Sequence, residues 1–156
     1  MFLPLEKLII LKTVDTFAGT ADDVLMELAG ILVEERFEAE QLVFLKGDEG
    51  TSMYIIAQGR ARVHDGEKTF RVLEEREIFG ELALIDAEKR SASITAVEET
   101  ILFRLDQGAF FELIADRFEV CEGLIRVITN RIRTLRGGQA RRPPPGAPSA
   151  PTGSNQ

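Results

Sequence analysis

The sequence predicts a mainly β domain in which helices flank a closed roll or barrel of short strands. Helical periodicity occupies the first thirty or so residues and returns after Asp106. Between them, short strand-like runs alternate with the turn signals "KGDEG", "QG" and "HDG". The runs are "LVFL", "SMYIIA", "RARVH", "KTFRVL", "SASITAV" and "TILFRL". Many short strands with regular turn signals are typical of rolls and barrels.

Two helices are predicted before the strands. A first helical face begins with Leu5, Leu8, Ile9 and Lys12 and ends near residues 13–17. The second helix begins in "TADDVLMELAG", with Thr20 as its cap and two aspartates in its positively polarised first turn. Its expected buried stripe consists of Val24, Leu25, Leu28 and Leu32.

Turn chemistry predicts one hairpin in particular. Asp65-Gly66 separates two strand-like runs, and both residue types tolerate positive φ, so we expect a type I′ turn there. His64, next to this turn, is expected at the surface.

After Asp106, a candidate cap, helices are predicted over "QGAFFELIA" and "FEVCEGLIRVITNRIRTLR". Residues 137–156 carry almost no bulky apolar side chain and are predicted to be disordered.

Composition narrows the function classes. The 156 residues include 19 Lys and Arg against 26 Asp and Glu, a net charge of −7, which argues against a nucleic-acid partner. A single histidine, His64, excludes metal sites built on several histidines, and no metal is expected. A single cysteine, Cys121, excludes an intrachain disulfide and favours a reducing compartment. No apolar run approaches the length of a transmembrane helix.

The segment "EIFGELALIDAEKRSASITA", residues 77–96, carries the clearest chemistry. Gly80 before a short helical pattern lets backbone N–H groups converge on an anion. Arg90 supplies a planar guanidinium that matches two phosphate oxygens. Glu81 suits a hydroxyl donor better than a phosphate. Together these residues indicate a small phosphorylated sugar as the ligand.

Within this segment, "FGELALIDAEKRSASITA" resembles the phosphate-binding cassette of cyclic nucleotide-binding domains. Upstream, "LVFLKGDEGTSMYIIAQGRARV" is similar to that family's paired strands around a Gly-Asp turn. The resemblance extends from Leu5 to Arg136. It implies an eight-stranded β-roll, related to the double-stranded β-helix or jelly roll, with an N-terminal helical bundle and two C-terminal helices. The binding domain is accordingly placed at residues 1–136.

The resemblance also implies a role for each residue of the cassette. Arg90 pairs with the cyclic phosphate, and Glu81 accepts a hydrogen bond from the ribose 2′-hydroxyl. Backbone N–H groups along the phosphate come from Gly80, Leu82, Ala83 and Ser91. The last helix would cover the base, and its candidate contacts are Ile128, Arg131 and Ile132.

Three positions depart from the family pattern outside the cassette. The family often has glycine where this chain has Glu40 and Arg76, and aspartate where it has Thr51. These departures concern turn geometry more than ligand chemistry.

The sequence favours a ligand-sensing module over an enzyme. The predicted ligand is cAMP or cGMP, with cAMP preferred because Ser91 stands where threonine tends to favour guanine in the family. The alternative is a cyclic nucleotide-binding fold that has lost its ligand and acts as a structural or interaction module. The effector domain or partner protein is not identified. The expected location is cytoplasmic, including the cytosolic part of a larger membrane protein.

Overall fold

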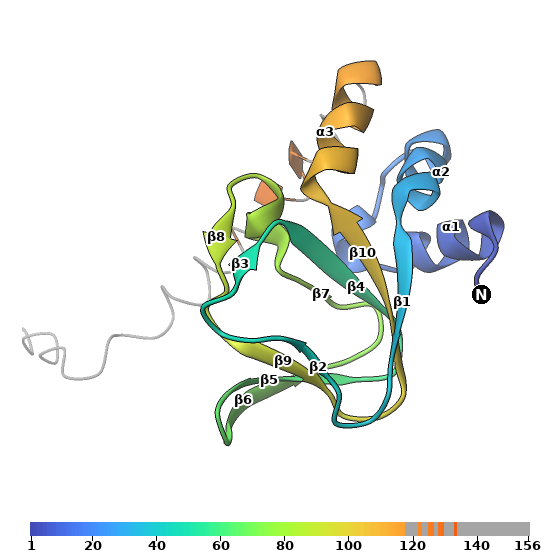
Figure 1. Cartoon of the computed structure of the whole chain (residues 1–156). Helices are drawn as coiled ribbons and strands as arrows, with labels where there is room; N and C mark the ends of the chain where they lie inside the picture. The colour runs from blue at the N-terminus through green and yellow to red at the C-terminus, as the bar shows by residue number, and fades with distance from the viewer. Residues whose placement is uncertain (118–121, 123–124, 127, 130–132, 134–156) are drawn as a thin grey trace, which may run out of the picture.

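A computed structural model describes residues 1–117, 122, 125–126, 128–129 and 133. Two helices and a short 3₁₀ turn precede the strands: α1 (Pro4–Lys12), η1 (Asp15–Phe17) and α2 (Asp22–Ile31). In the continuously described part of the chain, residues 1–117, α3 (Gln107–Asp116) follows them. Figure 1 shows these helices gathered on one side of the strands. This is the predicted order of helices, strands and helix.

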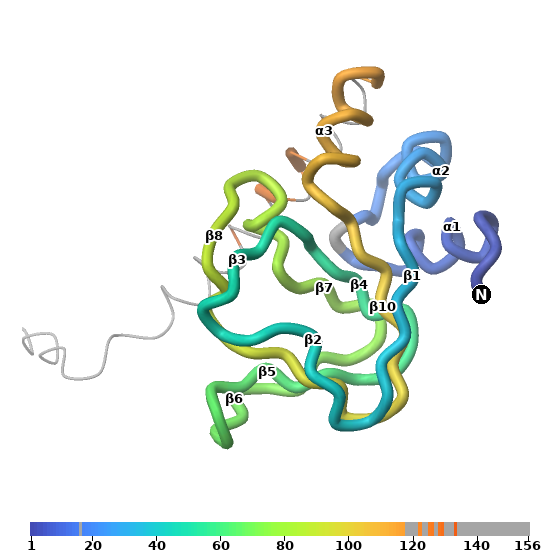
Figure 2. The backbone as a smooth tube through the Cα atoms, viewed as in Figure 1, coloured from blue at the N-terminus to red at the C-terminus, as the bar shows by residue number. Residues whose placement is uncertain are grey.

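The strands form two four-stranded antiparallel sheets. The first has the order β1 (Val33–Phe37), β10 (Thr100–Asp106), β4 (Ser52–Gln58), β7 (Ile78–Phe79). The second has the order β2 (Leu42–Phe44), β9 (Ser93–Ala96), β5 (Ala61–Asp65), β6 (Lys68–Leu73). A small third sheet pairs β3 (Glu49–Gly50) with β8 (Glu88–Lys89). Figure 2 shows the chain winding between the two larger sheets as a roll, which confirms the predicted jelly-roll-like class.

Strand β4 shows how the roll is filled. Six of its seven residues are buried, so both faces of this central strand are covered. Met53 and Ile55 point to the core shared with the helices, whereas Tyr54 and Ile56 point to the core between the sheets. Both residues belong to the run "SMYIIA", which was predicted as a strand, and that prediction is confirmed.

The predicted face of α1 is wrong in two positions. Leu5 and Ile9 are exposed, and the buried side chains are Leu8, Ile10 and Leu11. The helix has apolar residues on more than one face, so periodicity alone selected the wrong stripe. The face that packs is set by contact with α2.

The stripe of α2 is confirmed, because Val24, Leu25, Leu28 and Leu32 are all buried. The predicted cap is wrong. The helix begins at Asp22 with Ala21 as the N-cap residue, and Thr20 lies one position too early. The backbone N–H of Thr20 instead donates to the carbonyl of Phe17 and closes the preceding turn.

The hairpin between β5 and β6 turns one residue later than predicted. Asp65 pairs with Lys68, so the turn residues are Gly66 and Glu67, and only Gly66 has positive φ. His64 was expected at the surface but is only 7% exposed. Its Nδ1 lies 2.8 Å from the Gly66 carbonyl oxygen and its Nε2 lies 2.7 Å from Thr95 Oγ1. These two bonds allow the ring to be buried.

Two of the positions that depart from the family pattern have an unusual backbone. Glu40 (φ 68°) and Arg76 (φ 73°) are the non-glycine residues with positive φ in the described part of the chain. This is the conformation that glycine adopts without a steric penalty.

The predicted last helix lies largely outside the described residues, and the predicted tail (137–156) lies entirely outside them.

Candidate functional site

A pocket of about 400 Å³ opens between the second sheet and the 77–92 segment. Its floor is contributed by apolar side chains of β5, β6 and β9, and one wall is η2 (Glu81–Leu84). The stretch from β8 to β9, which includes Arg90, also lines the pocket. The lining residues used below are Phe44, Val63, Arg71, Leu73, Phe79 and Ile94.

The pocket brings together every predicted cassette residue. The cassette residues on its lining are Gly80, Glu81, Leu82, Ala83, Arg90 and Ser91. The predicted base contacts are not brought together in the same way. Ile128 is partly exposed and does not line the pocket in the described part of the chain, and Arg131 and Ile132 lie outside the described residues.

Aromatic rings fix the position of the Arg90 guanidinium. Its central carbon lies 4.2 Å from the ring centroid of Phe44 and 6.0 Å from that of Tyr54. Tyr54 stacks on Phe79 with ring centroids 5.0 Å apart. A guanidinium over an aromatic face is stabilised by the ring quadrupole, most strongly when water is excluded. Strands β2 and β4 therefore contribute the rings that face this charge, and Phe79 on β7 packs against Tyr54.

Two glycines provide the space that Arg90 occupies. A Cβ added at Gly50 would collide with Nε and Cζ of Arg90. A Cβ added at Gly80 would lie 2.7 Å from Arg90 Nη1. Gly80 also has φ 75°, which glycine adopts readily and which turns the chain into η2. Both glycines thus leave space for the side chain of the same arginine.

The Arg90 charge has few compensating groups. Its Nη2 donates to the carbonyl oxygen of Ser52 at 2.9 Å. Within the described residues, no carboxylate lies within ion-pairing distance of this guanidinium. Burial lowers the pKa of Arg90, although Tyr54 and Asp48 favour its charged form. A partly buried cation without an acidic partner has free capacity for an anion.

The 3₁₀ turn η2 presents the acid and the backbone of the cassette. Glu81 is only 8% exposed and lies on the pocket wall at the first position of η2. Leu82, by contrast, is 44% exposed. The Ala83 N–H donates to the Gly80 carbonyl at 3.2 Å. A phosphate would therefore have to share this donor or replace that bond.

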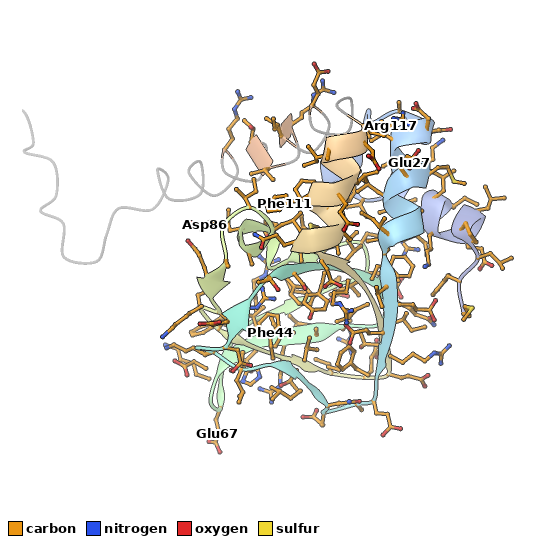
Figure 3. The ribbon with its side chains drawn as sticks, turned by 45° about the horizontal axis from the view of Figure 1, so that its top comes forward. Glu27, Phe44, Glu67, Asp86, Phe111 and Arg117 are labelled. Atoms are coloured by element: carbon orange, nitrogen blue, oxygen red, sulfur yellow. The ribbon has the colours of Figure 1, made fainter. Side chains whose placement is uncertain are left out.

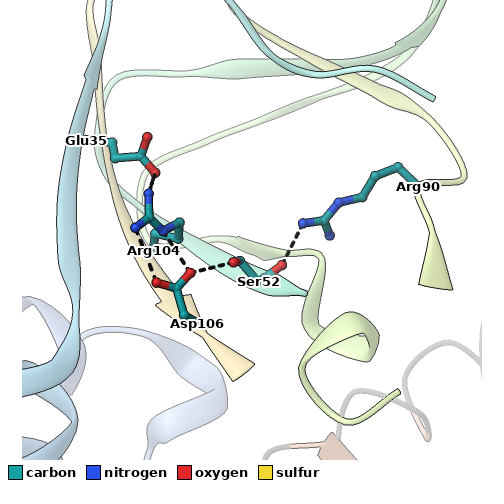
Figure 4. Close-up of polar contacts among 5 residues, drawn as sticks. All are labelled: Glu35, Ser52, Arg90, Arg104 and Asp106. Atoms are coloured by element: carbon teal, nitrogen blue, oxygen red, sulfur yellow. Dashed lines mark hydrogen bonds and ion pairs between the residues drawn. The ribbon is translucent and has the colours of Figure 1, made fainter. Parts of the chain in front are cut away.

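Behind Arg90, a series of polar contacts leads away from the pocket (Figure 4). The Ser52 hydroxyl donates to Asp106 Oδ1 at 2.6 Å. Arg104 donates to Asp106 Oδ1 from Nε at 2.8 Å and to Glu35 Oε1 from Nη1 at 2.6 Å. Burial raises the pKa of Asp106, but the hydrogen bonds from Ser52 and Arg104 outweigh it and hold that pKa below its usual value.

Sequence reasoning missed the surroundings of the arginine. Phe44 and Tyr54 were recognised only as strand residues, Phe79 only as the first residue of the cassette resemblance, and Gly50 only as part of a turn signal. Arg71 was placed on a strand without a role, yet it lines the pocket and forms an ion pair with Glu77. No local sequence signal links Gly50 to Arg90, which lies forty positions later, because their approach depends on the pairing of β3 with β8.

Two further findings concern other chemistry. Within the described residues, no three His, Cys, Asp or Glu side chains are grouped as a metal site. In that same part of the chain, no helix is long and apolar enough to cross a membrane.

The fold and this pocket define a class of protein. The family described as "Cyclic nucleotide-binding domain" matches residues 34–117, which is more than half of the chain, so the protein belongs to this family. The match includes the whole 77–96 segment and Arg90.

Individual relatives agree with this membership. The chain is 31% identical over 136 residues to a CRP-like cAMP-activated global transcriptional regulator of Mycobacterium tuberculosis, covering 84% of this chain and 61% of the regulator. It is 40% identical over 74 residues to a cGMP-dependent protein kinase of Toxoplasma gondii, covering 47% of this chain and 7% of the kinase. The chain thus spans less than two thirds of these relatives.

A solved structure shows the same fold over nearly its whole length. It is the N-terminal domain of a transcriptional regulator from Streptomyces coelicolor A3(2), which has a TM-score of 0.75 and 27% sequence identity. The match covers 86% of this chain and 96% of that structure.

Proposed function

We propose that the pocket binds a 3′,5′-cyclic nucleotide, cAMP in preference to cGMP, and that the domain acts as a sensor and not as an enzyme. The observation that carries this proposal is the state of Arg90. Its guanidinium is partly buried on the Phe44 ring, its pKa is lowered by burial, and no carboxylate among the described residues pairs with it. A phosphodiester would supply the missing negative charge.

The remaining lining accounts for the rest of the ligand. Glu81, on the pocket wall, would accept a hydrogen bond from the ribose 2′-hydroxyl. The N–H groups of Gly80, Leu82, Ala83 and Ser91 would face the phosphate. The apolar floor suits the ring atoms of a sugar and base, and its side chains include Val63, Leu73 and Ile94.

Closure of the last helix over the base is the proposed output. Leu82 and Ile85 are exposed beside the pocket, and Phe111 is half-exposed on the neighbouring α3 (Figure 3). These side chains offer apolar surface to a helix that carries the candidate base contacts Ile128, Arg131 and Ile132. A ligand shifts such a helix only by the difference in its affinity for the open and closed states.

The preference for cAMP rests on Ser91, and one observation favours cGMP instead. Arg71 lines the pocket, and an arginine can donate to O6 and N7 of guanine together. Its guanidinium is held by Glu77, so contact with a base would require a change of partner. The relatives named above include one called cAMP-activated and one called cGMP-dependent. Both nucleotides must therefore be tested side by side.

The competing function is a structural or interaction module without a ligand. The departures at Glu40 and Arg76 supported it, but neither residue lines the pocket, and the pocket retains all six cassette residues. We propose that residues 1–136 form the binding module and that residues 137–156 are a tail outside it.

Thermal melting with added nucleotides tests the proposal. A ligand that binds only the native state raises its stability by about 2.7 kcal/mol at a hundredfold excess over Kd, which is a shift of several degrees. We expect this shift with cAMP, a smaller one with cGMP at equal concentration, and none with 5′-AMP, which lacks the cyclic phosphodiester. Equal melting temperatures with and without all three nucleotides would favour the ligand-free module.

A further inference from the structure

We infer that Asp106, acting through Ser52, is a positioning residue that holds Arg90 in its binding orientation. This inference rests on the proposed function in so far as Arg90 is the ligand's counter-charge. Neither Asp106 nor Ser52 lines the pocket. Their effect on a ligand would therefore be indirect, through the arginine.

Ser52 forms hydrogen bonds with both Arg90 and Asp106. Its carbonyl oxygen accepts the hydrogen bond from Arg90 Nη2, and its hydroxyl donates to Asp106 Oδ1 at 2.6 Å. Figure 4 shows the two contacts leaving Ser52 in opposite directions. Any displacement of Ser52 therefore moves the acceptor that orients the guanidinium.

The segment that contains Ser52 needs such an anchor. Ser52 is the first residue of β4, and Thr51 separates it from the two-residue strand β3. Gly50, in β3, lies directly against Nε and Cζ of Arg90. Residues 50–52 therefore contact the guanidinium twice but stand at the ends of two strands, where regular pairing is weakest.

Asp106 is itself firmly held. Its carboxylate accepts from Arg104 Nε at 2.8 Å and from Arg104 Nη2 at 3.2 Å. Arg104 in turn reaches Glu35 on β1. The next residue, Gln107, donates its backbone N–H to the carbonyl of Thr51 at 2.9 Å. The anchor thus transmits the rigidity of the β1–β10 pair to the segment beside Arg90.

The Asp106 carboxylate has no capping role that would explain it otherwise. It is the N-cap residue of α3, yet its side chain makes no hydrogen bond to the first turn of that helix. Its carboxylate accepts hydrogen bonds from Ser52 and Arg104 instead. The carboxylate therefore binds Ser52 on strand β4, beside the pocket, although its sequence position predicted a helix cap.

The test compares Ser52→Ala, which removes the hydroxyl but keeps the carbonyl, with Ser52→Thr, which keeps both. Thr100→Val is the matched control, because the buried Thr100 hydroxyl on β10 donates only to the carbonyls of Arg60 and Glu98. Two readouts are made on each full-length protein. One is the hydrogen-exchange rate of the Arg90 Nε–H in the ligand-free state, with its NMR signal identified by its loss in Arg90→Lys. The other is the Kd for cAMP by calorimetry.

We expect Ser52→Ala to speed the Arg90 exchange and to weaken cAMP binding by roughly five- to tenfold. Ser52→Thr should restore both values, and Thr100→Val should change neither. Asp106→Ala removes the acceptor of the Ser52 hydroxyl and should resemble Ser52→Ala, and the double variant should be no worse than the worse single one, because both changes break the hydrogen bond between these two residues.

Exchange and Kd within twofold of the parent in Ser52→Ala would overturn the inference, as would equal effects in Thr100→Val. If the parent binds neither cAMP nor cGMP, the proposed function fails. The exchange rate of Arg90 in the ligand-free state then still decides whether Asp106 and Ser52 position it.

Discussion

The guanidinium of Arg90 lies over the ring of Phe44, with its central carbon 4.2 Å from the ring centroid. The two residues belong to different parts of the chain, since Phe44 ends β2 and Arg90 lies between β8 and β9. The contact orients the cation before any ligand arrives. Several predictions about the pocket depend on this preorganisation.

Replacing Phe44 by leucine should weaken cyclic nucleotide binding while keeping an apolar side chain in place. A cation–π contact contributes about 0.5–2 kcal/mol, so we expect a loss of roughly two- to thirtyfold in affinity, measured by calorimetry. Phe70→Leu is the control, because Phe70 forms a similar contact with Lys68, 5.6 Å away, on the edge strand β6. Equal losses in both variants would show that the Phe44 contact has no special role.

Gly50→Ala should separate binding from stability. The added methyl group would occupy the position of Nε and Cζ of Arg90, so the flexible side chain must move away while the backbone stays. We expect affinity to fall by at least tenfold, with about 1 kcal/mol or less lost in the free energy of unfolding. Calorimetry and urea denaturation measure the two quantities.

Gly108→Ala provides the matched comparison for Gly50→Ala. Gly108 lies in α3, and nothing stands within 4 Å of a Cβ added there. This variant should gain about 0.5–1 kcal/mol from helix propensity and bind like the parent. Parent-like affinity in Gly50→Ala as well would mean that Arg90 need not occupy its observed position.

The left-handed backbone at Glu40 predicts a stabilising substitution. A non-glycine residue with φ 68° is strained by about 1–2 kcal/mol. Glycine relieves this strain, but part of the gain in stability is lost because glycine has greater conformational freedom in the unfolded chain. Glu40→Gly should therefore raise the free energy of unfolding by up to about 1 kcal/mol in urea. Arg76→Gly should gain less, because Arg76 Nη1 also donates to the carbonyl of Ala57 at 2.6 Å.

Glu38→Gly controls for the loss of a glutamate from the same turn. Glu38 is exposed and is not among the residues with positive φ, so glycine there brings only added freedom in the unfolded state. We expect it to lower stability. A Glu40→Gly variant that is destabilised to the same degree would contradict the strain argument.

Acid sensitivity should include a contribution from Asp106. Its folded-state pKa is lowered by the hydrogen bonds from Ser52 and Arg104. A lowered pKa stabilises the fold above the unfolded value of 3.8, and this stability is lost as the pH falls through the folded value. Between pH 7 and pH 3, Asp106→Asn should therefore lose less stability than the parent in urea denaturation. Identical pH profiles would show that Asp106 does not contribute.

The elements with strong local patterns were predictable from the sequence. Strand β4 and helix α2 have continuous or periodic apolar residues, and both were placed correctly. Strand β1 was missed because its sequence "VEERF" is mostly charged, and it is a strand because it pairs with β10 along five residues. His64 was misplaced because its burial depends on Thr95, thirty-one positions away.

The candidate site was likewise predictable from the sequence only in part. The cassette is contiguous in sequence, so Gly80, Glu81 and Arg90 could be read from a single motif. The support of Arg90 is not contiguous. Phe44, Gly50 and Ser52 meet it only after three strands have paired, and nothing in their local sequence indicates this.

Calorimetric titration of cAMP and of cGMP into the parent and Arg90→Ala tests the central claim most directly. Arg36→Ala is the control, because Arg36 is an exposed arginine paired with Glu99. We expect the parent and the control to bind cAMP alike, and Arg90→Ala to lose roughly 2–5 kcal/mol, because a desolvated phosphate is left without its partner. Binding by Arg90→Ala within threefold of the parent would contradict the account.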